Sequence, residues 1–84
     1  MKKVELIYGI TCPYCRVANK MLSRIIEENP GKIVLKKTLV STPKGMIRRY
    51  KLGIHAVPAI LIDEKIVFRY LPEEEELKKE LKLI

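Results

Sequence analysis

Two cysteines separated by two residues are the part of this chain whose type and spacing most directly suggest chemistry. They stand in the sequence Cys12-Pro13-Tyr14-Cys15. Such a pair can form a reversible disulfide, supply half of a metal site, or occur by chance. A tetrahedral metal site needs three or four ligands, and beyond the cysteines only His55 is an obvious candidate. The pattern therefore favours a redox dithiol, with a metal site and chance placement as the weaker interpretations.

The cysteine pair falls between a predicted strand and a predicted helix. Residues 4–8 form a short apolar run with one charge, which is typical of a buried strand. From Pro13 onward, apolar residues recur at helical spacing until the Asn-Pro-Gly sequence at residues 29–31, where the helix should stop. The apolar residues of this helix are Val17, Ala18, Met21, Leu22, Ile25 and Ile26.

A helix start is a favourable place for an anionic sulfur. Cys12 is expected at or just before the first turn, where unpaired backbone N–H groups and the helix dipole stabilise negative charge. Arg16 adds a positive charge nearby. Cys15 lies one turn into the helix, within reach of a mixed disulfide on Cys12, and should place its sulfur closer to the interior.

The next segments continue an alternating pattern. Residues 32–40 predict a second strand, and strand, helix and strand in this order make a parallel, right-handed pair. A short helix is expected over residues 43–52, between a hydroxyl cap at Thr42 and a stop at Gly53. The residues expected on its apolar face are Met46, Ile47 and Tyr50.

A hairpin and a helix complete the predicted fold. Residues 59–62 and 66–70 predict two strands joined by a three-residue link. A last helix opens at Pro72 with four glutamates, which suit the positive end of a helix dipole. Its expected apolar residues are Leu77, Leu81 and Ile84. The order βαβαββα predicts one α/β domain over residues 1–84, with a four-stranded mixed sheet flanked by three helices.

The net charge of +7 belongs to the middle of the chain. Lysine and arginine number 17 against 10 acids, and the stretch between Asn29 and Ile62 has seven bases and no acid. The seven bases are Lys32, Lys36, Lys37, Lys44, Arg48, Arg49 and Lys51. Lysines on an edge strand discourage aggregation, and the bases of the helix at 43–52 are expected on its solvent side. Solvation accounts for most of them, while docking of an acidic protein partner stays open.

Binding of nucleic acid is disfavoured. Single-strand binders combine a basic groove with stacked aromatic side chains. The aromatic residues here are dispersed and are expected mainly in the core: Tyr8, Tyr50, Phe68 and Tyr70. We expect no nucleic-acid partner, and we expect His55 to be a solvated loop residue.

The cysteine count and the length of the apolar runs exclude further classes of protein. Two cysteines are too few for a disulfide-stapled secreted scaffold. No signal peptide is indicated, and the longest apolar run is far below the roughly 20 residues of a membrane span. We therefore expect a soluble, cytoplasmic protein, a monomer that does not bind membranes and carries no cofactor or metal.

The chain resembles the thioredoxin/glutaredoxin superfamily over nearly its whole length. The resemblance lies in the Cys-Pro-Tyr-Cys motif after the first strand, in Val57-Pro58 before the third strand, and in the element order. It is similar to the small archaeal glutaredoxin-like proteins, which often behave more like thioredoxins. The resemblance implies strand order 2-1-3-4, a cis proline at Pro58 and pairing of the Val57 backbone with substrate. It also implies that Cys12 is the nucleophile, that Cys15 is the resolving thiol and that the two form the redox-active disulfide.

Departures from the family patterns bear on the electron donor. Glutathione-using glutaredoxins usually carry Gly-Gly and a polar residue after the fourth strand, where this chain reads Tyr70-Leu71-Pro72-Glu73. They also tend to carry a base at the position of Gly9. Thioredoxins, for their part, have tryptophan and a buried acid at the positions that Thr11 and Leu6 occupy here.

These departures favour disulfide-containing proteins as substrates and a thioredoxin reductase-like donor over glutathione. Tyr14 is expected to contact substrate in the groove beside the dithiol. The alternatives are a redox-inactive thioredoxin-fold module that binds an acidic partner through its basic segment, and a metal-binding protein.

Overall fold

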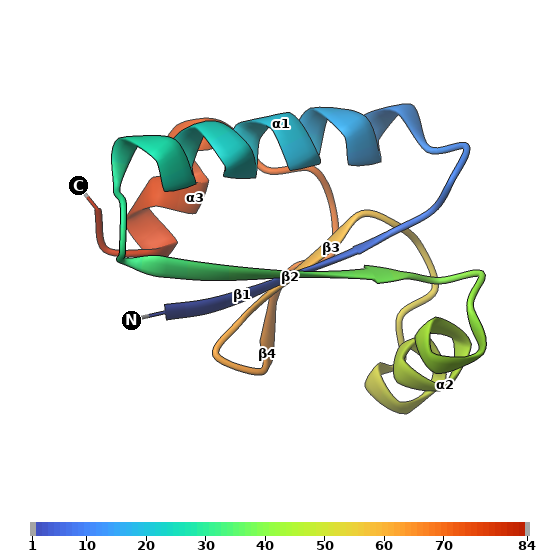
Figure 1. Ribbon diagram of the computed structural model, residues 1–84. Coiled ribbons are helices and arrows are strands. Elements are labelled where there is room, and N and C mark those ends of the chain that lie inside the picture. The colour runs from blue at the N-terminus through green and yellow to red at the C-terminus, as the bar shows by residue number, and fades with distance from the viewer. Residues whose placement is uncertain (1, 84) are drawn as a thin grey trace.

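A computed structural model describes residues 2–83 and contains the seven predicted elements in the predicted order (Figure 1). They are β1 (Lys2–Tyr8), α1 (Pro13–Glu28), β2 (Ile33–Leu39), α2 (Pro43–Leu52), β3 (Ala59–Ile62), β4 (Lys65–Phe68) and α3 (Glu74–Glu80). The sheet has the order β2-β1-β3-β4, as expected. β1 pairs with β2 in parallel and with β3 antiparallel, and β3 and β4 form the hairpin. β2 is therefore an edge strand.

The two faces of the sheet are covered unequally. α1 and α3 lie over one face, whereas α2 lies at one end of the other (Figure 1). Successive side chains of a strand point to opposite faces, so Leu6 of β1 joins the larger core with α1 and α3, while Ile7 joins a smaller core. The smaller core contains Ile7, Ile54, Ala59 and Leu61, with Leu52 of α2 packed against it.

α1 packs along a stripe that contains Cys15, Ala18, Met21, Leu22 and Ile25. Val17 was expected on this apolar face, but 47% of its surface is exposed. At about 100° per residue, position 17 lies about a quarter turn from the centre of the stripe, so its side chain is at the border of the buried face.

α2 packs against the sheet with a different face from the predicted apolar one. The residues expected to pack inward are exposed, at 59% for Met46, 58% for Ile47 and 88% for Tyr50. The inward stripe consists instead of Gly45, Arg48 and Leu52. A Cβ at Gly45 would lie 1.8 Å from the Leu39 carbonyl oxygen, so only glycine allows this approach of helix to strand.

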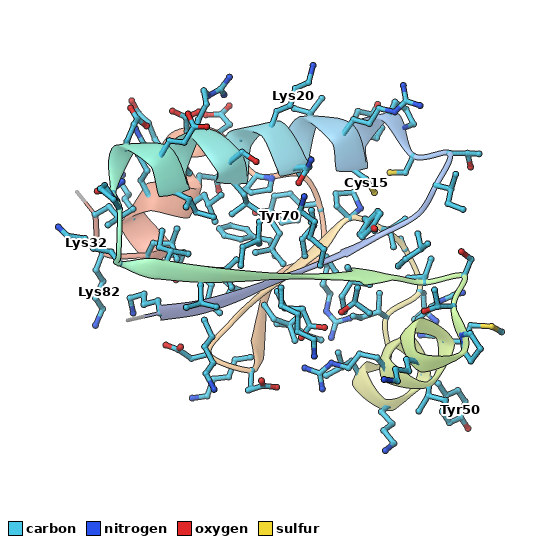
Figure 2. All side chains as sticks on the ribbon, viewed as in Figure 1. Cys15, Lys20, Lys32, Tyr50, Tyr70 and Lys82 are labelled. Atoms are coloured by element: carbon cyan, nitrogen blue, oxygen red, sulfur yellow. The ribbon has the colours of Figure 1, made fainter. Side chains whose placement is uncertain are left out.

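The aromatic core prediction is correspondingly half wrong. Phe68 is buried, whereas Tyr50 points away from α2 into solvent (Figure 2) and Tyr70 is 56% exposed. Tyr70 follows β4, which ends at Phe68, and its ring meets that of Phe68 edge-on with centroids 5.8 Å apart. Tyr70 therefore packs against the core residue Phe68 but keeps more than half of its own surface exposed.

The β3–β4 turn is tighter than the predicted three-residue link. Asp63 and Glu64 have φ angles of 49° and 71°, and Lys65 already begins β4. Two successive residues with positive φ are typical of a type I′ turn, whose twist matches that of the flanking strands. The Asp63 carboxylate accepts a hydrogen bond from the Lys3 N–H at 3.1 Å.

α3 closes the larger core. Glu73 and Glu76 form a capping box at its start, and Leu77 and Leu81 are buried as predicted. Ile84, expected on the same face, lies outside the described residues. No helix among residues 2–83 is both long and apolar enough to cross a membrane.

Candidate functional site

Cys12 is the N-cap residue of α1. Its backbone is extended, with φ −97° and ψ 109°, and Pro13 begins the helix as predicted. The Cys12 sulfur accepts a hydrogen bond from the backbone N–H of Cys15 at 3.1 Å. This N–H is one of the helix donors that have no partner within the helix, so it is available to stabilise a negative sulfur. Cys12 is also partly exposed to solvent.

Cys15 lies below Cys12 and is only 3% exposed. Its side chain points from α1 toward the sheet (Figure 2). Burial and, to a lesser extent, the neighbouring Cys12 sulfur raise the pKa of the Cys15 thiol, a backbone hydrogen bond at Gly9 lowers it in part, and the net pKa is about 11. Both cysteines are free thiols here. The site therefore pairs an accessible sulfur at a helix start with a buried, protonated one.

The Val57-Pro58 segment lies against this pair. Its peptide bond is cis, as expected, and Pro58 is buried. The Cys12 sulfur is 3.9 Å from the Val57 carbonyl oxygen, although 45 residues separate the two in sequence. The β3–β1 pairing brings the start of β3 beside the end of β1, and this places the proline next to Cys12.

A groove of about 370 Å³ runs beside the cis proline. Its lining residues are Tyr14, Val57, Pro58, Arg69, Tyr70 and Leu71. Tyr14 is 63% exposed, so its ring is available for contact. The residues singled out from the sequence, Cys12, Pro13, Tyr14, Cys15, Val57 and Pro58, thus come together at one end of the sheet.

A second hollow, of about 350 Å³, lies behind the buried thiol. Cys15 lines it with Asn19 of the next α1 turn and with Lys37, which β2 directs to the same face of the sheet. Lys36 points to the other face, as alternation along a strand requires. Sequence reasoning treated both lysines as edge protection and did not place Lys37 near the dithiol.

A buried carboxylate beneath α2 was also missed. Glu5 of β1 is 6% exposed and accepts hydrogen bonds from Arg48 at 2.7 and 3.2 Å and from Thr38 at 2.7 Å. Arg48 also donates to Glu64 at 2.8 Å. Arg48 was expected on the solvent side of its helix, and this expectation was wrong because a charged residue inside a central strand requires a buried partner.

The hydrogen bonds between Glu5, Thr38, Arg48 and Glu64 shift the pKa values of Glu5 and Arg48. Burial raises the pKa of Glu5, but the hydrogen bonds from Arg48 and Thr38 lower it more, so the net pKa lies below its ordinary value. The pKa of Arg48 is raised by its bonds to Glu5 and Glu64. The only signal in the sequence was position: Glu5 interrupts an otherwise apolar strand.

His55 lies apart from the hollow behind the dithiol. It is exposed, and it lines a separate depression with Met46 and Tyr50. Across the described part of the chain, residues 2–83, no three side chains of His, Cys, Asp or Glu come together as a possible metal site.

Comparison with known proteins identifies relatives of the whole chain. The family model of the thioredoxin domain matches residues 2–82. A Probable Thioredoxin of Archaeoglobus fulgidus is 34% identical over 79 residues, which cover 94% of this chain and 85% of that protein. The Thioredoxin of Methanocaldococcus jannaschii is 26% identical over 80 residues, or 95% of this chain and 92% of that protein.

Solved structures share the fold. A thioredoxin-like protein from Clostridium perfringens superposes with a TM-score of 0.84 at 22% identity, covering 99% of this chain and 70% of that one. A mutant thioredoxin from Halobacterium salinarum gives 0.79 at 17% identity, covering 98% and 73%. Together with the family match, these relatives show that the chain belongs to the thioredoxin family.

Proposed function

We propose that this protein is a thiol-disulfide oxidoreductase that reduces disulfides of proteins or small molecules through Cys12 and Cys15. The observation that carries the proposal is that two thiols, three residues apart at the start of α1, differ in their exposure to solvent. Cys12 is accessible and accepts an N–H bond at the helix start, while Cys15 is 3% exposed below it. The kinship with proteins named thioredoxin supports the same class of chemistry.

In the first step, the Cys12 thiolate attacks one sulfur of a substrate disulfide. A bond forms between Cys12 and that sulfur, the substrate S–S bond breaks, and the released thiolate takes a proton. An accessible sulfur is required because the attack proceeds along the axis of the substrate S–S bond. The N-cap position supplies both access and a stabilising donor.

In the second step, the Cys15 thiolate attacks Cys12 and releases the second substrate thiol. The Cys12–Cys15 disulfide forms, so the protein has given two electrons to the substrate, which has gained two protons. Cys15 must first lose its proton, and its pKa of about 11 makes this step slow at neutral pH. Engagement of Cys12 in the mixed disulfide removes the part of that elevation which comes from Cys12.

The groove beside the dithiol is the place for substrate in this proposal. The Val57-Pro58 segment, 3.9 Å from the Cys12 sulfur, would hold an extended substrate backbone, and Tyr14 would cover it from the other side. The protein needs no bound cofactor for the exchange itself. A reductase returns the disulfide to the dithiol, and potentials between about −270 and −200 mV bracket the carriers of this kind.

Turnover of insulin disulfides tests the proposal. Wild-type protein should catalyse reduction, Cys12→Ser should abolish it, and Cys15→Ser should halt after a mixed disulfide with Cys12. Parallel assays with thioredoxin reductase or with glutathione as donor should favour the reductase. A wild-type protein with two titratable thiols and no turnover would instead support a redox-inactive binding module.

A further inference from the structure

We propose that the outer face of α2 is a docking surface for the protein partner of the dithiol, and that this partner presents an acidic segment with an apolar side chain. We define the α2 face as Lys44, Met46, Ile47, Tyr50 and Lys51. The proposal rests on the proposed function, since it concerns the protein that exchanges electrons with Cys12.

The apolar residues of this face have no role inside the fold. Met46, Ile47 and Tyr50 are 59%, 58% and 88% exposed, because the helix contacts the sheet through Gly45, Arg48 and Leu52. Three large apolar side chains on the solvent side of a ten-residue helix form a contiguous patch. Apolar patches rimmed by polar residues are typical of protein interaction sites.

The charge around the patch selects the partner. Lys44 and Lys51 flank Ile47 one helical turn to either side, and both are exposed. Arg48, on the same helix, is already neutralised by Glu5 and Glu64. The lysines therefore place positive charge along one side of an apolar centre, which complements an acidic segment with an apolar anchor.

The position of the face connects it to the dithiol. β1 and β2 are parallel, so their C-terminal ends, which lead to Cys12 and to α2, lie at the same end of the sheet. Residues 53–58 then run from the end of α2 to the cis proline beside Cys12. A partner that brings its disulfide to Cys12 can rest on α2 at the same time.

A second copy of this chain is the less favoured occupant. The acidic run that could meet the α2 face is at the start of α3, where Glu73 and Glu76 form the capping box. Glu74 of the same run is bonded to Arg24 at 2.7 Å and to Lys78 at 3.4 Å. Glu73, Glu74 and Glu76 are thus engaged within the molecule.

Three disulfide peptides of equal length test the proposal. Each carries one disulfide and an arm of ten residues, which reaches about 33 Å and so matches the 34 Å length of the molecule. One arm alternates glutamate with leucine, the second alternates lysine with leucine, and the third contains glycine and serine. The rate constant for reduction by the dithiol protein is measured for each from 20 to 500 mM salt.

Matched variants test whether the α2 face causes any preference for the acidic arm. Lys44→Glu/Lys51→Glu changes the α2 face, while Lys20→Glu/Lys32→Glu makes the same change of net charge at exposed sites on α1 and at the opposite end of the molecule (Figure 2). Tyr50→Ser tests the apolar centre. Analytical ultracentrifugation of each variant reports self-association.

At low salt we expect the acidic arm to react about tenfold faster than the glycine-serine arm, and the advantage to vanish at high salt. Lys44→Glu/Lys51→Glu should remove it and Tyr50→Ser should reduce it, with the glycine-serine rate unchanged. Equal loss in the Lys20→Glu/Lys32→Glu variant, or no preference for the acidic arm, would overturn the proposal. A dimer that dissociates in the α2 variants would also overturn it, by assigning the face to a second copy. Absence of exchange with all three peptides would instead reject the proposed function.

Discussion

Different interactions attach the helices to the two faces of the sheet. On the face that α1 and α3 cover, the contacts are apolar and include fully buried residues such as Leu22, Ile25 and Leu77. On the face that α2 covers, a smaller apolar cluster is joined by a buried carboxylate and an arginine. α2 is thus attached mainly by charge-assisted hydrogen bonds and close backbone contact, with Leu52 as its one large apolar contact, so Met46, Ile47 and Tyr50 stay on the outside.

The largest difference between the faces should come from truncating apolar side chains. Leu22→Ala leaves a cavity in the larger core and should lower the free energy of unfolding by about 3 kcal/mol. Ile47→Ala, on the α2 face, should change it by less than about 0.5 kcal/mol because Ile47 is 58% exposed. Urea titrations at pH 7 measure both. Equal losses would contradict the inward stripe assigned to α2.

Removing the buried charge should have an intermediate effect. Glu5→Gln weakens the bonds from Arg48 and Thr38 and should cost about 2 kcal/mol at pH 7, since Arg48 keeps Glu64 as a partner.

The effect of Glu5→Gln should depend on pH in a defined direction. The pKa of Glu5 is below its ordinary value of 4.5 in the folded protein, so its ionisation stabilises the fold above about pH 4.5. This contribution is lost as the pH falls through the folded pKa. Wild type and Glu5→Gln should therefore converge in stability toward pH 3 in urea titrations. A gap that widens in acid would show that Glu5 is not paired as described.

A smaller and equal effect is expected at the two glycines with positive φ. Gly53 ends α2 with φ 67°, and Gly31 precedes β2 with φ 78°, and neither would place a Cβ within 4 Å of another group. Alanine at either position should cost about 1 kcal/mol, because only the backbone conformation is penalised.

The same two variants should differ in their effect on the rate of exchange. Gly53→Ala should slow reduction of the acidic-arm peptide, because residue 53 joins α2 to the segment that reaches Pro58, whereas Gly31→Ala should leave that rate unchanged. If both variants slowed it equally, the loss would reflect stability and not the attachment of α2.

The sequence was sufficient for the element order, the strand order by resemblance, and the place of Cys12 at a helix start. The element order and the helix start depend on local patterns: apolar periodicity, Pro13 at the first helical position and stops at Asn29-Pro30-Gly31 and Gly53.

The orientation of α2 could not be predicted from such patterns. An apolar stripe normally identifies the buried face of a helix, but Gly45 lets the backbone of α2 approach Leu39 along a different face. Glu5 and its partner Arg48 are 43 residues apart in sequence, and the positive φ angles of Asp63 and Glu64 are uncommon for residues other than glycine. These features depend on tertiary contacts and on turn geometry set by neighbouring strands.

Cys12 is partly exposed whereas Cys15 is buried with a raised pKa, and we expect the two thiols to act one after the other for that reason. Limited alkylation of the reduced protein with iodoacetamide at pH 7 tests it most directly. Trypsin releases both cysteines in one peptide, residues 4–16, and fragmentation of that peptide in a mass spectrometer locates the label. Because Cys15 is 3% exposed with a pKa of about 11, we predict that Cys12 carries at least about ten times more label. Equal labelling, or preferential labelling of Cys15, would contradict the account.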